Sequence, residues 1–60
     1  MYYYVEINYY DKSNDTLDYC DTLEEAREIY NWANDARDTC GVRAAYIQYD
    51  GKILASFNAE

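Results

Sequence analysis

The side chains in this sequence that could do chemistry are mainly carboxylates and tyrosines. The 60 residues include 12 Asp or Glu, nine Tyr and two Cys, but no His. Without an imidazole there is no Ser-His or Cys-His nucleophile pair, no His general base and no His-ligated zinc. A catalytic carboxylate needs a pocket that shifts its pKa, and we expect so short a chain to have little room for a cavity of about 300 Å³ or more. We therefore expect a protein that is not an enzyme and has no cofactor and no metal.

Residues 11–15 begin like a calcium-binding loop, because oxygen-bearing side chains occupy the first, third and fifth positions. The rest of the pattern fails, since Thr16 stands where the sharp turn requires Gly and Thr22 stands where a bidentate Glu should follow. Short polar side chains of this kind also bond their own backbone in turns. We interpret the segment as a polar hairpin turn.

Five polar residues recur at helical spacing and form one stripe. At about 100° per residue they fall within about 80° of one another. They are Glu24, Glu28, Asn31, Asp35 and Asp38. The helix dipole favours acids in the first turns but disfavours Asp35 and Asp38 near the other end. The stripe is either a solvated face kept for solubility or a surface that binds a partner.

Tyrosines form a second candidate surface, on the outward side of the first predicted strand, where acids accompany them. The residues expected there, with one acid from the neighbouring strand, are Tyr2, Tyr4, Tyr10, Glu6 and Asp18. Tyr is enriched at protein interfaces, and an exposed Trp32 beside the apolar face of the helix would extend such a patch. The alternative is that Tyr is present for its β-propensity and that this face packs on a second copy.

Hydrophobic patterning indicates the elements that must position these residues. Residues 2–10 alternate as a strand whose inward side is the more apolar; the inward residues are Tyr3, Val5, Ile7 and Tyr9. Residues 16–20 are typical of a second strand, with Leu17 and Tyr19 expected to face inward. The two strands flank the polar turn and predict a hairpin.

A helix is predicted to follow this hairpin. Thr22 and Glu25 have the spacing of a capping box, in which Glu25 reaches back to the Thr22 amide. Good helix formers continue to about residue 38, and Gly41 supplies the left-handed residue that commonly ends a helix. Apolar residues fall on one side at helical spacing. They are Leu23, Ala26, Ile29, Tyr30, Ala33, Ala36 and Cys40.

Residues 42–49 and 52–57 flank Asp50-Gly51, a strong hairpin signal, and the register of a two-residue turn places Ile47 opposite Leu54. Both faces of this hairpin remain candidates for burial, but the face without a charge is favoured. The favoured residues are Ala44, Tyr46, Ile53, Ala55 and Phe57. The residues of the other face are Arg43, Ala45, Ile47, Tyr49, Lys52 and Leu54.

The order ββαββ predicts a single α+β domain over residues 1–60, with an antiparallel sheet and one helix packed on one of its faces. The predicted helix is about 25 Å long at about 1.5 Å per residue. It separates Cys20 from Cys40, whereas a disulfide needs Cα atoms closer than about 7 Å. We expect two free thiols. A disulfide between two copies is still possible, and Cys20 is a candidate for it if this residue lies on the exposed sheet face.

The formal charge is −7, which makes direct binding of nucleic acid unfavourable because phosphate contacts need Lys and Arg. The expected partner is instead a basic surface. No stretch approaches the roughly 20 apolar residues of a membrane span, and the N-terminus lacks the basic and apolar regions of a signal peptide. We expect a cytoplasmic protein that does not bind membranes.

In size, acidity, element order and lack of a catalytic set, the whole chain resembles the small acidic inhibitor proteins of bacterial viruses, especially anti-CRISPR proteins. Several of those act as DNA mimics. The resemblance implies a protein of the host bacterial cytoplasm that binds a CRISPR–Cas effector subunit and blocks DNA recognition. Its acids would then pair with the Lys and Arg that normally hold DNA.

Two alternatives to an inhibitor remain open. The first is a ββαββ interaction module that dimerises through its tyrosine face or an edge strand. The second is a regulator that binds another nucleic-acid-binding protein, such as a repressor or a restriction enzyme. The sequence allows either a monomer or a homodimer.

Overall fold

Four antiparallel strands and one long helix make up the protein. The computed structural model describes residues 1–58. Its elements in chain order are β1 (Tyr3–Tyr9), the 3-10 turn η1 (Lys12–Asn14), β2 (Thr16–Cys20), α1 (Leu23–Asp35), β3 (Val42–Tyr49) and β4 (Lys52–Asn58). This order confirms the predicted α+β class and the ββαββ arrangement.

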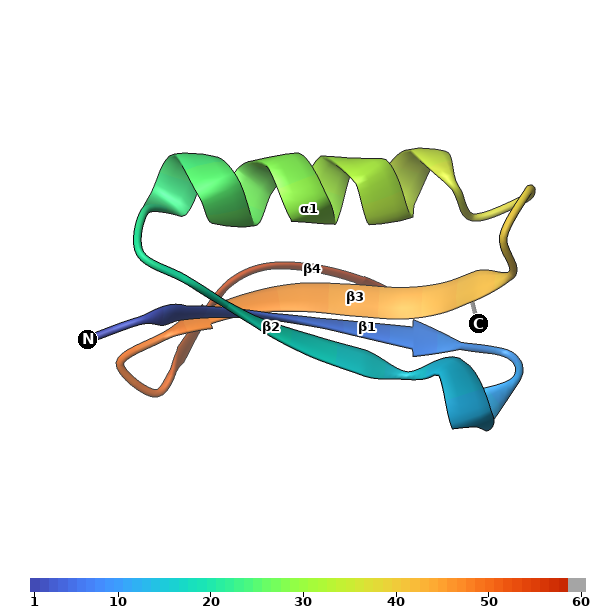
Figure 1. Ribbon diagram of the computed structural model, residues 1–60, viewed down its shortest axis with the longest axis horizontal. Helices are drawn as coiled ribbons and strands as arrows, with labels where there is room; N and C mark the ends of the chain where they lie inside the picture. The colour runs from blue at the N-terminus through green and yellow to red at the C-terminus, as the bar shows by residue number, and fades with distance from the viewer. Residues whose placement is uncertain (59–60) are drawn as a thin grey trace.

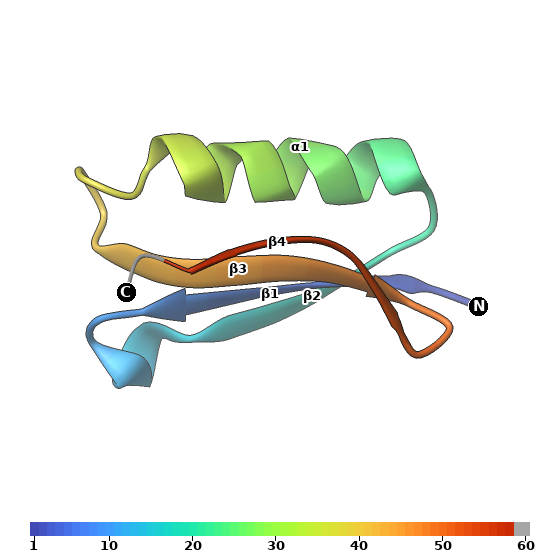
Figure 2. The same cartoon turned by 180° about the vertical axis from the view of Figure 1, so that it is seen from behind.

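The strands form one sheet in the order β2-β1-β3-β4, and every neighbouring pair is antiparallel. The helix α1 lies along one face of this sheet, and no α-helix of the described part lies on the other face (Figures 1 and 2). Because α1 carries the chain from the β2 edge back across the sheet, β3 pairs with β1 instead of with β2. The sheet therefore has β1 and β3 at its centre and β2 and β4 at its edges.

The core lies between α1 and the two central strands. Ala26, Ala33 and Ala36 on the inner side of the helix are buried, and their small side chains let the helix approach the sheet closely. The buried side chains beneath them come from β1 and β3; they are Val5, Ile7, Val42, Ala45 and Ile47. On the β4 side, the rings of Tyr30 and Phe57 pack against each other in an edge-to-face arrangement, with centroids 5.6 Å apart.

One helix is too narrow to cover this sheet. Four strands spaced about 4.8 Å apart span roughly 15–20 Å, whereas a helix with its side chains is about 10 Å across. The helix consequently covers the central pair and leaves the space above each edge strand open. No layer formed by residues 1–58 packs on the opposite face of the sheet, and we call it the open face.

The inward residues predicted for β1 are confirmed, but those predicted for β2 are wrong. Val5 pairs with Asp18 across the strands, and directly opposite residues point to the same face. Asp18 therefore lies on the helix side, while Leu17 and Tyr19 point to the open face with 51% and 66% of their surface exposed. The pairing with β1 overrides the local alternation of β2.

The predicted core face of the last hairpin is wrong in part. Its Ala55 and Phe57 lie on the helix side, where they pack against the core. Ile53 lies on the open face, and 54% of its surface is exposed. The cause is a bulge: Ile47 pairs with Ala55 while the next residue of β3 pairs with Ile53, so that Leu54 is an extra residue that reverses the alternation.

Ala45 and Ile47 of β3 lie in the core because they pair with Ile7 and Val5 of β1. Ala44 and Tyr46, which were predicted to face inward, instead pair with open-face residues of β1. Ile47 lies opposite Ala55 and not opposite Leu54 as the two-residue turn register implies. The bulge shifts the pairing of β3 with β4 beyond the turn but leaves the turn itself unchanged. The residues of the turn therefore do not indicate that the bulge is present.

The helix begins as predicted and ends earlier. The Thr22 hydroxyl accepts a hydrogen bond from the Glu25 backbone N–H at 3.2 Å and donates to the Glu25 carboxylate at 3.2 Å, so Glu25 contacts the hydroxyl of Thr22 and not its amide. The helix ends at Asp35, not near residue 38, and a turn follows in which the Cys40 N–H donates to the Ala36 carbonyl at 2.8 Å. Gly41, with φ of 70°, then leads the chain into β3.

The turn between β3 and β4 provides a test of the fold. Asp50 and Gly51 have φ of 51° and 76°, as the favoured two-residue hairpin turn requires. A Cβ built on Gly51 meets no atom within 4 Å, so Gly51→Ala adds backbone strain alone. We expect it to lower the free energy of unfolding by about 1 kcal/mol, measured by urea denaturation.

The matched control is Asp50→Asn, because Asn tolerates the same left-handed conformation. Its free energy of unfolding should stay within about 0.5 kcal/mol of the parent protein. A Gly51→Ala variant as stable as the parent would contradict the turn geometry.

Candidate partner-binding surfaces

The acidic residues predicted for the helix lie on its outer side. Glu24, Glu28, Asn31 and Asp35 are exposed on α1. Asp38 is also exposed, but it lies in the turn after the helix, so its predicted angular position does not apply. The structure thus brings together four members of the stripe and places the fifth beyond the end of the helix.

The carboxylates of this stripe are not neutralised within the chain. Among residues 1–58 no Lys or Arg lies within ion-pair distance of them. The Arg37 guanidinium instead lies 5.0 Å from the centroid of the Phe57 ring and donates a hydrogen bond to Asn34 Oδ1 at 3.4 Å. The negative charge of the helix is therefore available to an external partner.

Glu6 differs from the other predicted acids because its carboxylate already has partners. The Tyr46 hydroxyl donates to Glu6 Oε1 at 2.6 Å, and Asn8 Nδ2 donates to Glu6 Oε2 at 2.9 Å. The hydrogen bond to Glu6, then burial, then the negative charge of Glu6 raise the pKa of Tyr46. Glu6 links β1 to β3 on the open face, a role that the sequence pattern did not indicate.

Aromatic rings gather on the open face where β1 meets β2. Tyr2 and Tyr4 are exposed there as predicted. Tyr19 joins them, with its ring centroid 5.0 Å from that of Tyr4 and 6.4 Å from that of Tyr2. Tyr10 is exposed but lies one residue past the end of β1. Sequence reasoning missed Tyr19 because it assigned this residue to the core.

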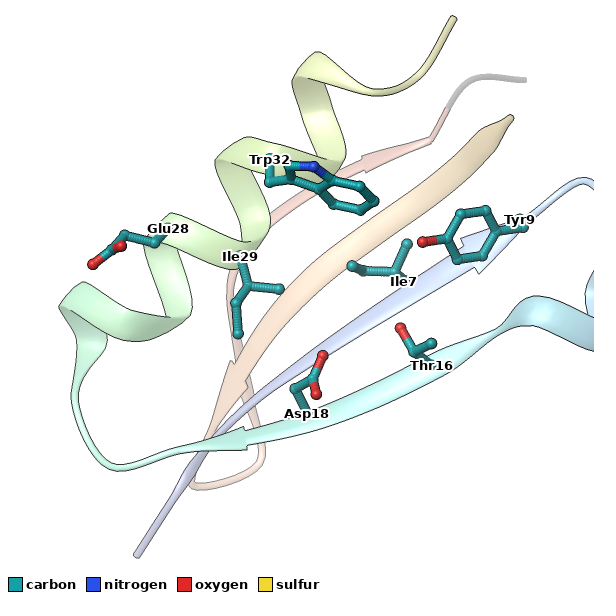
Figure 3. A pocket seen from close by; sticks show the side chains of 7 residues that line it. All are labelled: Ile7, Tyr9, Thr16, Asp18, Glu28, Ile29 and Trp32. Atoms are coloured by element: carbon teal, nitrogen blue, oxygen red, sulfur yellow. The ribbon is translucent and has the colours of Figure 1, made fainter. Parts of the chain in front are cut away.

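Asp18 does not lie beside these tyrosines, contrary to expectation. The pairing with Val5 places Asp18 on the helix side of the sheet, where it borders a groove between α1 and β2. Figure 3 shows the Asp18 side chain projecting from β2 toward the helix, below Ile29. The acid predicted for the tyrosine surface thus belongs to a separate site.

This groove has a volume of about 450 Å³, and we call it the β2 groove. Its lining residues come from α1, β1 and β2; they are Ile7, Tyr9, Thr16, Asp18, Glu28, Ile29 and Trp32. The groove is a shallow depression open to solvent, with a volume in the lower part of the range of about 300–1,000 Å³ usual for ligand pockets, so it can take a partner side chain but is not an enclosed cavity. A second groove, of about 400 Å³, lies on the β4 side of the helix and is lined in part by Arg27.

The loop at residues 11–15 is a hydrogen-bonded turn. The Asp11 carboxylate accepts from the Ser13 backbone N–H, the Ser13 hydroxyl and the Asn14 side chain at 2.8–3.2 Å. Asp15 accepts from the Tyr9 backbone N–H at 2.8 Å. Within residues 1–58 no group of three His, Cys, Asp or Glu side chains is placed to hold a metal ion. The predicted polar turn is confirmed.

Both cysteines are free, as predicted. Cys20 is buried, with 4% of its surface exposed, and it does not lie on the exposed sheet face that was considered for it. Burial raises the pKa of the Cys20 thiol, and the charges of Glu25, Asp18 and Asp21 raise it further. Cys40 is exposed, so any bridge between two copies would form through Cys40.

No helix in the described part of the chain is long and apolar enough to cross a membrane. Comparisons with protein-family models, curated proteins and solved structures found no match to this chain. The surfaces described above are therefore the basis on which we infer its function.

The Tyr46–Glu6 hydrogen bond predicts how stability changes at alkaline pH. Because the folded-state pKa of Tyr46 is raised, the interaction stabilises the fold below the ordinary tyrosine pKa of about 10 and is lost as pH rises through the raised value. We expect Tyr46→Phe to lower the free energy of unfolding by about 1 kcal/mol at neutral pH. We also expect the free energy of unfolding of this variant to decrease less at alkaline pH than that of the parent protein. Urea denaturation as a function of pH measures both effects, and Tyr10→Phe serves as the control with an unchanged profile. An identical alkaline profile for Tyr46→Phe would show that the hydrogen bond contributes nothing.

The two thiols should react at different rates, because the thiolate is the reactive form. In the native protein at neutral pH, a chromogenic disulfide reagent should modify Cys40 in a fast phase and Cys20 in a slow one. Cys40→Ser should remove the fast phase, and Cys20→Ser should remove the slow one. A fast phase that survives Cys40→Ser would contradict the burial of Cys20.

Proposed function

We propose that this protein is a non-enzymatic inhibitor that binds the basic nucleic-acid-binding surface of a host protein and so blocks DNA recognition. A CRISPR–Cas effector subunit is the favoured target, because the chain resembles anti-CRISPR proteins in size, acidity and element order. The observation that carries the proposal is the set of exposed α1 carboxylates without a cationic partner among residues 1–58.

A rigid helix presents these charges at fixed intervals. At about 1.5 Å per residue, Glu24 and Glu28 lie about 6 Å apart along the axis, and Glu28 and Asp35 about 10 Å apart. One DNA strand carries a phosphate about every 3.4 Å of helix axis, so each interval corresponds to the rise of two or three phosphates. Long Lys and Arg side chains on a DNA-binding surface can reach charges at this spacing.

Stability alone does not explain the acids at the far end of the stripe. Asp35 is the last residue of α1 and Asp38 follows it, and the helix dipole disfavours negative charge at that end. Their presence is consistent with selection for binding. An acidic face of this kind raises the association rate with a basic partner, and the binding weakens as salt screens the charges.

The clustering of Tyr2, Tyr4 and Tyr19 favours a second candidate function, a module that homodimerises through its open face. Tyr offers a large rigid contact area at low entropy cost, and aromatic residues dominate the binding energy of many interfaces. These rings lie on the side of the sheet opposite α1. The two candidate surfaces can therefore be tested separately.

The acidic surface is tested by Asp35→Asn/Asp38→Asn, with Asp21→Asn/Asp50→Asn as a control that removes the same charge elsewhere. We expect immobilised parent protein to capture a DNA-binding complex from a bacterial lysate at low salt but not at high salt, and added duplex DNA to compete. The test variant should retain about tenfold less, because each lost charge weakens a complementary contact, while the control stays within about twofold. Equal capture by both variants would contradict the proposal.

The tyrosine surface is tested by Tyr2→Ser/Tyr4→Ser/Tyr19→Ser. If the open face is a dimer interface, sedimentation equilibrium should show a dimer for the parent protein and a monomer for this variant. A dimer that survives the substitutions would exclude the open face as its interface. Loss of low-salt capture in this variant alone would assign target binding to the tyrosines instead of the acids.

A further inference from the structure

We propose that the β2 groove is an anchor site for an arginine side chain of the partner protein. The inference rests on the proposed function, because it assumes a basic partner, and it deepens that function by naming the residue the partner inserts. The groove combines an apolar floor, an exposed indole and the carboxylate of Asp18, with Glu28 at its rim (Figure 3).

The groove is polar along its β2 side because β2 turns polar residues toward the helix. Its helix-facing residues are Thr16, Asp18 and Cys20, and only Cys20 is buried. The larger apolar residues of the strand, Leu17 and Tyr19, point to the open face. A strand selected for packing alone would show the reverse pattern, and places where a sequence breaks the local rules are often functional.

The floor and one wall of the groove suit the flat, weakly hydrated guanidinium of arginine. Ile7 is buried beneath the groove and Ile29 is half-buried beside it. Trp32 leaves 49% of its surface exposed, and Figure 3 shows its ring reaching from the helix over Ile7. Guanidinium groups stack on indole faces, and the methylene stem of arginine packs on apolar surface.

The charges around the groove are complementary to a cation. Asp18 projects from β2 toward the helix, and Glu28 lies at the rim with its carboxylate directed outward (Figure 3). Within residues 1–58 no Lys or Arg lines this groove, whereas Arg27 lines the groove on the β4 side. The two grooves flanking the helix therefore differ in charge, and the β2 groove is the one that lacks its own cation.

This charge also argues against an uncharged apolar occupant. Covering Asp18 with an apolar side chain would remove the carboxylate from water without a compensating hydrogen bond, which is unfavourable. An arginine supplies donors in a planar fork that matches a carboxylate, together with a surface that stacks on Trp32. It therefore satisfies the apolar and the acidic parts of the groove at once.

The test uses a small probe, N-acetyl-arginine amide, so that it does not depend on identifying the partner. Trp32 is the only Trp of the chain, so fluorescence excited where tyrosine does not absorb reports on this groove. We expect a saturable change in this fluorescence, with shifts of the Trp32 indole and Ile29 amide signals in NMR spectra. N-acetyl-citrulline amide, a neutral molecule of the same shape, should give no saturable change.

The variant Asp18→Asn/Glu28→Gln should weaken binding of the arginine probe about tenfold or more, a change of about 1.4 kcal/mol. Glu24→Gln/Asp35→Asn removes the same charge outside the groove and should leave the dissociation constant within about twofold. If both variants weaken binding of the arginine probe equally, the effect comes from net charge alone and the proposed site is wrong. Equal binding of the citrulline probe would overturn the role of the carboxylates.

A stability measurement separates this role from a structural one. Asp18→Leu places an apolar side chain in the groove, so it should abolish probe binding while raising the melting temperature. A lowered melting temperature would mean that Asp18 supports the fold, against the inference. If the arginine probe binds but no basic protein is captured, the proposed function is wrong and the arginine site is still supported. If a basic protein is captured but the probe does not bind, only the arginine site is wrong.

Discussion

The structure depends on the contact between one narrow helix and the two central strands of a wider sheet. Ala26 and Ala33 let α1 approach β1 and β3 closely, and Val5 and Ile47 fill the space beneath them. Because this contact forms the core, most of the surface of the two edge strands is only partly covered. The grooves beside the helix and the open face are direct consequences of that geometry, and all of the candidate binding surfaces lie on them or on the outer side of the helix.

A small domain with half of its sheet uncovered needs other sources of stability. A chain of about 60 residues buries only about 60% of the surface that it exposes when unfolded. On the open face, the Glu6 carboxylate joins β1 to β3 through Tyr46, and the ring of Tyr19 packs beside that of Tyr4. These contacts between neighbouring strands replace part of the packing that a second layer would provide.

Features set by a few neighbouring residues were predictable from the sequence. The Thr22 cap, the Asp50-Gly51 turn and the alternation of β1 each depend on local chemistry, and each is present in the structure. The core faces of β2 and β3 were assigned incorrectly, and that of β4 was wrong at Ile53, because these faces depend on strand register. The bulge at Leu54 arises from pairing with β3, and pairing across the sheet leaves no mark in the local pattern.

The same distinction applies to the candidate sites. Exposure of the helical acids followed from helical periodicity, because α1 packs through its apolar side. The β2 groove was not predictable, since Asp18 enters it only through the register with Val5. Trp32 was recognised at the border of the apolar face, but its place beside Ile7 and Asp18 required the tertiary fold.

The acids around β2 have a consequence for the behaviour of the protein at high concentration. As an edge strand, β2 presents unpaired backbone groups that could template the addition of another strand, and the sheet beside it displays exposed Tyr and Leu. Asp15 and Asp21 flank the strand and Asp18 stands within it, so two such edges repel each other. The carboxylates therefore oppose edge-to-edge pairing of two copies, while a positively charged strand would meet no such barrier.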